Sequence, residues 1–413
     1  MNSKISTVRG FAMVCVVLFS SVVATNRAAA ASSDVVLDWD AIAVTTMSTQ
    51  SPFAQARFAA ITQLAVFEGV NAVTGDYEPY LGTIGAPDGA SAEAAAIAAA
   101  YRVLINYFPG SSGTLDPARA NSLAAIADSA AKTDGIVVGV AAADAMIALR
   151  VGDGSTPLTT KPLPGAVTPG VWQPTPSCAG GGGQFFNWKD VTPFGIPSAA
   201  DFILGPPPSL TGGEYAKDYN EVKTVGSVGS TARPQDRSDV ARFYAASSPT
   251  FVMNSAARQV AAAQGRSLSE NAHDLALLNM AISDSLVVSF ATKYTHNFWR
   301  PETAIHASGE AFVPYITTPC FPSYPSNHAS GSNGGAEVLR RMYGGGGHAI
   351  TMSNPNVPSI SAIVLQYTSF KQITDDVDDA RVYGGIHFRF EQEAGGRLGR
   401  NVATYITKHN LQK

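Results

Sequence analysis

Cysteine, positive charge and long apolar runs are all scarce in this chain of 413 residues, and each absence excludes a class of protein. A net charge of -4 disfavours nonspecific binding to nucleic acid or to anionic membranes. No apolar run reaches the roughly 20 residues of a stable transmembrane helix without a charged or polar break. We therefore expect no nucleic-acid partner and no membrane span.

The N-terminus has the three-part pattern of a secretory signal peptide. Lys4 and Arg9 precede an apolar run over residues 11–24, and Arg27 precedes the small residues 28–31. We predict a signal peptide over residues 1–31 and a secreted or periplasmic protein over residues 32–413. Loss of these three cations with no acidic residue takes the formal charge from -4 to -7.

Few cysteines remain after such a cleavage. Cys15 leaves with the signal peptide, so that Cys178 and Cys320 are the only cysteines of residues 32–413. An oxidising compartment would allow one disulfide between them. Two free thiols are the alternative, because the sequence does not test whether the two Cα atoms lie within about 7 Å of each other.

Strand-like alternation is rare and no internal repeat or interdomain linker is recognisable, so the predicted fold class is all-α with one domain. Its catalytic part is expected over about 269–410. Two Pro- and Gly-rich stretches, 157–208 and 309–325, predict long irregular loops of the kind that often border a functional site. Helical patterns occupy residues 39–73, 91–108, a stretch starting at Asp116–Pro117, 136–150, 235–246, 269–299, 331–343, 363–380 and 387–408.

The first of three basic or histidine-bearing segments is KYTHNFWRP. Lys293 and Arg300 are seven residues apart in a predicted helix, nearly two turns, so both would lie on one face, and Pro301 would end the helix. By itself this spacing is typical of a solvated helix surface. His296 and His306 nearby are expected to be structural or solvent exposed.

The second segment is FPSYPSNHASGSNGG, in which Ser326, Asn327 and His328 precede a predicted helix. Unsatisfied N–H groups and the helix dipole make a helix start an anion site, to which the Ser326 hydroxyl would add a donor. The alternative is that Ser326 only caps the helix and that His328 is a partly exposed residue of the turn.

The third segment is ARVYGGIHFRFEQEAG, with Arg381 six residues before His387 and Glu391 four residues after it. A carboxylate at that spacing can fix the imidazole tautomer. The alternative is a surface His/Glu pair worth a few tenths of a kcal/mol. Together the three segments supply three cations, a hydroxyl, backbone donors and two histidines. That set suits a tetrahedral oxyanion and its trigonal-bipyramidal transition state.

These segments resemble a pattern shared by type 2 phosphatidic acid phosphatases, bacterial acid phosphatases and vanadium haloperoxidases. The pattern Lys-x6-Arg-Pro, Pro-Ser-Gly-His and Ser-Arg-x5-His-x3-Asp corresponds here to residues 293–301, 325–328 and 380–391. HNFWRPETAI, FPSYPSNHAS and GGIHFRFE resemble the haloperoxidase branch more closely. DWDAIAVTTM, LAVFEGVNAV and WQPTPS extend that resemblance over most of residues 32–413.

The resemblance implies a helical bundle with vanadate bound through His387 as the single vanadium ligand. His328 would be the acid/base residue, Lys293 would polarise hydrogen peroxide, and Glu391 would support His387 from behind. The residues that would bind the oxygens of vanadate or phosphate are Lys293, Arg300, Ser326, Asn327 through its main chain, and Arg381.

Three positions depart from the pattern: Asn327 replaces Gly, Ala380 replaces Ser and Glu391 replaces Asp. Asn tolerates a left-handed backbone, although its side chain could crowd the oxyanion. Ala380 lacks the serine hydroxyl that would help to position Arg381. Phe321, seven residues before His328, matches an aromatic residue of chloroperoxidase-type members, which is a hint about the halide.

Three functions are compatible with these residues. The resemblance favours a vanadium-dependent haloperoxidase that uses hydrogen peroxide, halide and an organic acceptor and forms hypohalous acid. The first alternative is an acid phosphatase that cleaves a phosphate ester through a phosphohistidine at His387. The second is an oxyanion-binding protein without turnover. Because phosphate and vanadate are near isosteres, the site residues alone do not separate the first two.

Overall fold

The computed structural model describes residues 34–413 except 164, 166, 179 and 180. Asp34–Lys413 forms one compact unit. Within the described residues there are thirteen α-helices and one small sheet, which confirms the all-α prediction. The predicted signal peptide, 1–31, lies outside the described residues.

Helices of 7 to 29 residues make up most of the structure. Their bounds are α1 (Val35–Thr46), α2 (Pro52–Thr74), α3 (Ala92–Tyr107), α4 (Ser112–Ala124), α5 (Ala130–Leu149), α6 (Gly213–Val225), α7 (Gln235–Ala245), α8 (Pro249–Gln264), α9 (Leu268–His296), α10 (Pro301–Ala307), α11 (Asn327–Tyr343), α12 (Phe370–Tyr383) and α13 (Arg389–His409). The sheet pairs β1 (Ile350–Ser353) with β2 (Val364–Tyr367) in antiparallel register, Ile350 opposite Tyr367.

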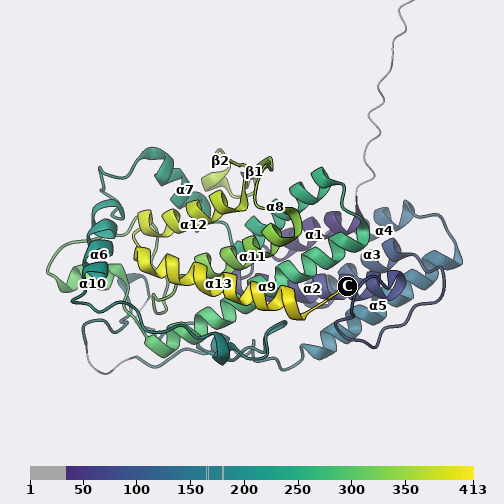
Figure 1. Ribbon diagram of the computed structural model, residues 1–413, viewed down its shortest axis with the longest axis horizontal. Helices are drawn as coiled ribbons and strands as arrows, with labels where there is room; N and C mark the ends of the chain where they lie inside the picture. Colours follow the sequence, from purple (N-terminus) through teal and green to yellow (C-terminus); the bar gives the residue numbers. More distant parts are fainter. Residues whose placement is uncertain (1–33, 164, 166, 179–180) are drawn as a thin grey trace, which may run out of the picture. The chain divides into compact units, whose positions relative to one another are not determined.

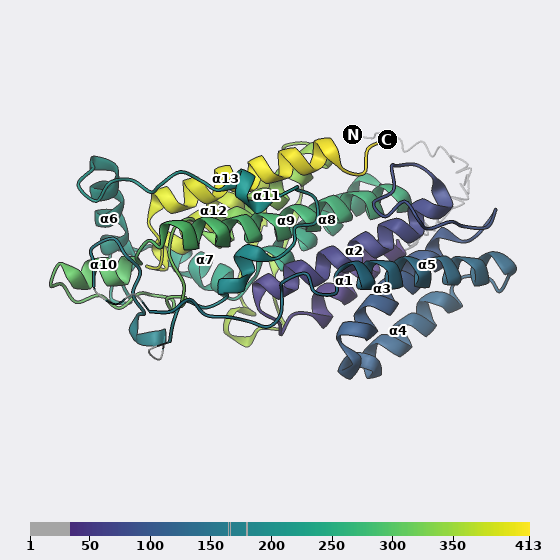
Figure 2. The ribbon, with the colours of Figure 1, turned by 90° about the horizontal axis from the view of Figure 1, so that it is seen from below.

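The central helix is α9, which contacts α2, α11 and α13 (Figures 1 and 2). It begins at a capping box in which Ser267 and Glu270 satisfy each other's backbone N–H groups. It is long and apolar enough to cross a membrane, with a mean hydropathy of 1.6, but that stretch is wholly buried inside the protein. The burial identifies α9 as the core of the bundle.

Small residues let α11 and α13 approach closely. A Cβ atom at Gly399 would lie 2.1 Å from the Ser330 carbonyl oxygen, and one at Gly395 would lie 2.6 Å from the Ser326 carbonyl oxygen. The contact joins the N-terminal ends of the two helices, where the Ser326 N–H donates to the Glu391 carbonyl at 3.0 Å. The predicted second and third segments are thereby placed next to each other.

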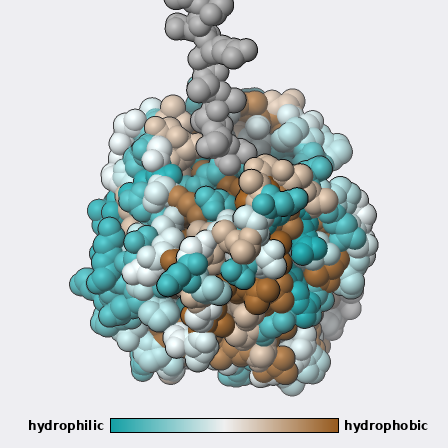
Figure 3. All heavy atoms as spheres, turned by 90° about the vertical axis from the view of Figure 1, so that its right-hand side faces the viewer, coloured by the Kyte–Doolittle hydropathy of each residue, from teal (hydrophilic) through white to brown (hydrophobic). Residues whose placement is uncertain are grey.

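The helices α2 to α5 form the other part of the unit, at the right of Figures 1 and 2. Alanine and glycine again permit close contact, since a Cβ atom at Gly139 of α5 would lie 2.1 Å from the Ala95 carbonyl oxygen of α3. Seen from this end, the surface mixes hydrophobic with hydrophilic residues (Figure 3). α2 connects this part to the site, because its N-terminal residues reach α9.

Several predicted boundaries were wrong. The helix predicted over 39–73 is interrupted before Ser51, whose hydroxyl caps α2 by accepting the Ala54 N–H at 3.3 Å. The stretch expected to start at Asp116–Pro117 starts at Ser112, and Pro117 lies inside α4. Residues 364–367, predicted as helix, pair with β1 instead. The helices α6, α8 and α10 were not predicted.

The placement of Arg300 on the same helix as Lys293 was also wrong. α9 ends at His296 because Asn297 adopts a left-handed conformation, with φ of 48°. Arg300 follows in extended backbone as the N-cap of α10. The two cations still meet, since Lys293 Nζ and Arg300 Cζ lie 5.5 Å and 5.1 Å from the centre of the Phe321 ring. A turn, and not a shared helix face, brings them together.

The α11–α13 contact predicts the cost of adding one methyl group. Gly399→Ala should lower the free energy of unfolding by about 2–3 kcal/mol, because the new Cβ would overlap the Ser330 backbone. Urea titration would measure it. Gly113→Ala in α4 is the matched control, since its Cβ would meet no atom within 4 Å, and it should be neutral or stabilising. Equal stability of Gly399→Ala and the unchanged protein would contradict the close contact.

Candidate active site

The second and third predicted segments line one cavity of about 390 Å³, and the first segment contacts both of them. Its lining includes Asn327 and His328 from the start of α11, Arg381 from the last turn of α12, and His387 from the turn before α13. Arg300 lies beside His387, with Nη1 3.1 Å from His387 Nε2. The structure thus brings together residues up to 87 positions apart.

His387 is held in one tautomer by Glu391. His387 Nδ1 donates to Glu391 Oε2 at 2.6 Å, and the same oxygen accepts the Ser323 hydroxyl at 2.7 Å and the Phe388 N–H at 3.0 Å. Three donors on one oxygen identify Glu391 as the carboxylate and acceptor. The Nε2 lone pair of His387 is therefore free to bind an electrophile, and in its absence accepts from Arg300.

The electrostatic surroundings keep His387 neutral. Burial, followed by the charges of Arg300 and Lys293, lowers the pKa of His387 well below its usual value. Burial also raises the pKa of Glu391 to about 7, against the opposing effects of Arg300 and Lys293. A buried neutral imidazole with an oriented lone pair is a ligand or a nucleophile, and a poor acid.

Two arginines have open donors in the site. Arg300 uses Nε on the Phe321 carbonyl at 2.9 Å and Nη1 on the Ile386 carbonyl at 3.0 Å, whereas Nη2 is buried without a partner among the described residues. Arg381 Nε is likewise buried and without a partner there. Burial lowers the pKa of Arg300 to about 10 and of Arg381 to about 9, so both stay charged at neutral pH. An anion is the strongest acceptor for such donors.

Lys293 is wholly buried and faces a loop. Its Nζ donates to the carbonyl oxygens of Pro322 at 3.0 Å, Ser323 at 2.6 Å and Pro325. Burial, followed by the charge of Arg300, lowers the pKa of Lys293 well below its usual value. The three carbonyl oxygens nevertheless accept one hydrogen bond each from Nζ, which requires the three N–H groups of the protonated amine. Lys293 therefore fixes the turn before α11 and adds positive charge behind the cavity.

The start of α11 has the predicted Ser326 cap and also borders the cavity. Ser326 caps the helix by accepting the Ala329 N–H at 3.3 Å, and its hydroxyl hydrogen remains a possible donor. His328 is partly exposed and lines the cavity. Burial, followed by Arg381 and Lys293, lowers the pKa of His328 well below its usual value, which keeps it neutral.

Several residues of the site were missed by the sequence analysis. Ser323 supports Glu391, and Ser289 donates to Asn327 Oδ1 at 2.6 Å. Ser289 precedes Lys293 by four residues, so helical periodicity could have found it. Phe53 and Phe185 line the cavity from the other part of the chain, and no local signal marks them.

A disulfide joins Cys178 and Cys320, with Cα atoms 5.4 Å apart. It ties the irregular stretch 157–208 to the loop that carries Phe321. The Gln184 N–H donates to the Cys320 carbonyl at 2.8 Å and reinforces this link. His296 and His306 have structural roles, as each ring Nε2 binds a backbone carbonyl, of Leu204 and Phe312 respectively, at 2.8 Å.

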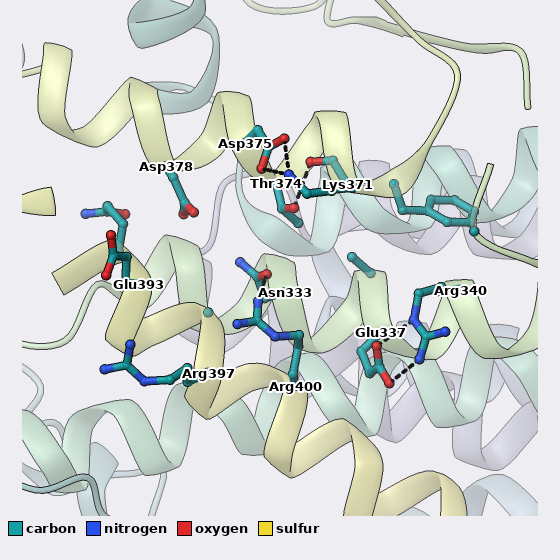
Figure 4. A pocket seen from close by; sticks show the side chains of 15 residues that line it. Asn333, Glu337, Arg340, Lys371, Thr374, Asp375, Asp378, Glu393, Arg397 and Arg400 are labelled. Carbon is teal, nitrogen blue, oxygen red and sulfur yellow. Dashed lines mark hydrogen bonds and ion pairs between the residues drawn. The ribbon is translucent and has the colours of Figure 1, made fainter. Parts of the chain in front are cut away.

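Outside this cavity, many charged side chains of the described residues pair with each other. Within the described residues no group of three or more His, Cys, Asp and Glu side chains could hold a metal ion. A larger pocket of about 600 Å³ between α11, α12 and α13 contains none of the predicted residues (Figure 4). There, Glu337 pairs with Arg340 and Lys371 with Asp375.

Comparison with known proteins agrees with this geometry. Residues 273–413 match the family model described as the VCPO second helical-bundle domain. The structure resembles that of the first bacterial vanadium-dependent iodoperoxidase, with a TM-score of 0.77 and 24% identity over 92% of this chain and 96% of that one. The chain has the vanadium haloperoxidase fold.

Two further solved structures of this fold are similar. The apo form of a bacterial vanadium-dependent chloroperoxidase gives a TM-score of 0.68 and 15% identity, over 87% of this chain and 95% of that one. The holo form of a bacterial vanadium-dependent chloroperoxidase gives 0.66 and 15%, over 88% and 94%. No curated protein matches the chain by sequence. The likeness to these vanadium haloperoxidases therefore establishes the fold of the chain.

The lowered pKa of His328 predicts a loss of stability in acid. An unfolded histidine takes up a proton near pH 6.5, whereas folded His328 does so only at lower pH, so stability falls as pH falls below about 6.5. The loss attributable to His328 should approach about 1.4 kcal/mol per pH unit. Urea unfolding between pH 6.5 and 5.5 would measure it against His328→Gln. Parallel curves for the two proteins would show that His328 titrates normally.

Asn327 predicts a second test of the oxyanion site. Its Oδ1 is held by Ser289, while Nδ2 is buried without a partner among the described residues, in a side chain that lines the cavity. Asn327→Asp keeps the Ser289 contact and replaces the donor with an anionic oxygen. Affinity for phosphate should fall roughly 10- to 100-fold. Calorimetry on the vanadium-free protein would measure it, with Asn327→Gly as the milder control. Unchanged affinity of Asn327→Asp would mean that the anion binds elsewhere.

Proposed function

We propose that the protein is a vanadium-dependent haloperoxidase, which oxidises halide with hydrogen peroxide to hypohalous acid. One observation carries the proposal: the Nε2 lone pair of neutral His387 lies beside Arg300, which has a buried N–H without a partner among the described residues. The resemblance to solved vanadium iodo- and chloroperoxidases supports it. The net reaction is H₂O₂ + X⁻ + H⁺ → HOX + H₂O.

The residues present fit vanadate as the cofactor. His387 would bind it through Nε2, and its oxygens would be held by Arg300, Arg381, the Ser326 hydroxyl and the main-chain N–H of Asn327. When bound, vanadate supplies the Lewis acid on which hydrogen peroxide becomes an electrophile toward halide. Lys293 would contribute charge from behind the loop.

His328 is suited to move the protons of this reaction. It lines the cavity, and Arg381 and Lys293 help to keep it neutral. A neutral imidazole can accept a proton from entering hydrogen peroxide and return it to the departing water or hydroxide. The cationic surroundings that lower its pKa also make the protonated form a ready donor.

The same geometry suits the phosphatase alternative, in which His387 attacks phosphorus and His328 protonates the leaving group. We also propose that the protein is exported. The Cys178–Cys320 disulfide supports that proposal, because disulfides persist in oxidising compartments.

The deciding experiment assays purified protein with hydrogen peroxide and iodide, bromide or chloride, with and without orthovanadate, beside hydrolysis of a chromogenic phosphate ester. Vanadate-dependent halide oxidation is expected. Ester hydrolysis by the vanadium-free protein without any halide oxidation would instead establish the phosphatase.

Two histidine variants separate binding from turnover. His387→Ala should abolish both vanadate binding, measured by calorimetry, and halide oxidation. His328→Ala should retain vanadate binding and lose roughly 10²- to 10⁴-fold in kcat, since it removes only proton transfer. Full vanadium content and activity in His387→Ala would refute its assignment as the ligand.

A further inference from the structure

A second cavity, of about 600 Å³, lies between α11, α12 and α13 (Figure 4). It shares no lining residue with the cavity that contains His387. On α12 the lining residues Phe370, Thr374 and Asp378 are spaced four apart, and those of α13 repeat the spacing, so each helix turns one face toward it. The volume is in the usual range of small-molecule pockets.

Gln392 is the most informative residue of this second cavity. It lines the cavity, and its side chain is wholly buried. Neither the Nε2 donor nor the Oε1 acceptor of its amide has a hydrogen-bond partner among the described residues. Burying an amide without partners is unfavourable unless another molecule supplies them. A ligand of this cavity should therefore accept from Nε2 and donate to Oε1.

Charged side chains of both signs line the same cavity, and half of them are already paired. Glu337 binds Arg340 at 2.7 Å, and Lys371 binds Asp375 at 2.6 Å. These two ion pairs satisfy their members without a ligand. The charges that can recognise a ligand are therefore the remaining ones.

Two carboxylates and two arginines remain, namely Asp378, Glu393, Arg397 and Arg400. Arg400 donates through Nη1 to Asn333 Oδ1 at 2.6 Å. The other three make no hydrogen bond or ion pair within the part of the chain that the structure describes. Equal numbers of free cations and carboxylates suit a zwitterion, because a simple anion or cation would face like charge.

The unpaired groups gather at one end of the cavity. Asp379 binds Arg389 at 2.8 Å, which places the end of α12 beside the start of α13. Asp378 therefore lies near Gln392, as Figure 4 also shows for its neighbour Glu393. Phe370 is eight residues before Asp378, about 12 Å away along α12, and lines the opposite end. The cavity thus has a polar end with both charges and an apolar end.

We propose that this second cavity binds a free α-amino acid. The carboxylate of the ligand would accept from Gln392 Nε2 and Arg397, and its ammonium group would donate to Gln392 Oε1 and Asp378. An apolar side chain would extend toward Phe370. The ligand takes no part in the proposed haloperoxidase reaction, so the failure of either proposal leaves the other intact.

The first test compares three ligands by calorimetry on the purified, vanadium-free protein. The probe is L-leucine, and its analogues 4-methylpentanoate and 3-methylbutylamine lack the ammonium group and the carboxylate respectively. Leucine should bind saturably at roughly millimolar concentration or below, and about 10-fold more tightly than either analogue, because the site recognises both charged groups. Absence of saturable leucine binding, or equal binding of leucine and an analogue, would overturn the proposal.

The second test locates the binding site. Asp378→Asn and Gln392→Leu should each weaken leucine binding about 10-fold, and Asp378→Asn should leave the binding of 4-methylpentanoate unchanged. Asp375→Asn is the matched control, since Asp375 already binds Lys371, and it should leave leucine binding unchanged. Asn327→Asp, which alters the other cavity, should do the same. Leucine binding that is insensitive to both Asp378→Asn and Gln392→Leu would refute the site.

Discussion

Glu391 connects the second and third segments of the site through its side chain and its own backbone. Its carboxylate accepts from His387, from Ser323 in the loop before α11 and from the Phe388 N–H at the start of α13. Its carbonyl accepts the Ser326 N–H at the start of α11. The orientation of His387, the loop that receives Lys293 and the helix start that faces the cavity therefore depend on one buried residue.

The charge balance around Glu391 explains why the site needs an anion. Lys293 and Arg300 are buried beside it, and Glu391 is the strongest opposing charge for both, joined at Arg300 by the buried Glu302. Backbone carbonyls offset part of the desolvation of Lys293 and Arg300. The open N–H groups that remain are costly unless an oxyanion accepts from them. Burial, followed by the same positive charge, lowers the pKa of both histidines and keeps them neutral.

The sequence predicted the parts of this arrangement that depend on local pattern. The Ser326 cap, the His387–Glu391 spacing and the buried α9 follow from helix periodicity and from capping preferences, and the structure contains all three. The end of α9 could not be predicted in this way, because a left-handed Asn297 is set by tertiary contacts. The partners of Lys293 could not be predicted either, because they are backbone carbonyl oxygens of a distant loop and do not depend on side-chain identity. Phe53 and Phe185 became visible only when the folded chain placed them in the cavity.

The two halves of the chain contribute different residues to the candidate active site. Residues 273–413, which match the family model, provide the histidines and cations of the site. Those groups would hold phosphate as readily as vanadate, so they fix the shape of the bound anion and leave the choice of reaction open. Phe53 and Phe185 belong to the first half of the chain, and the disulfide and the Gln184–Cys320 hydrogen bond join that half to the loop before α11. The cavity therefore combines residues that lie far apart in sequence and are brought together by backbone hydrogen bonds and one covalent link.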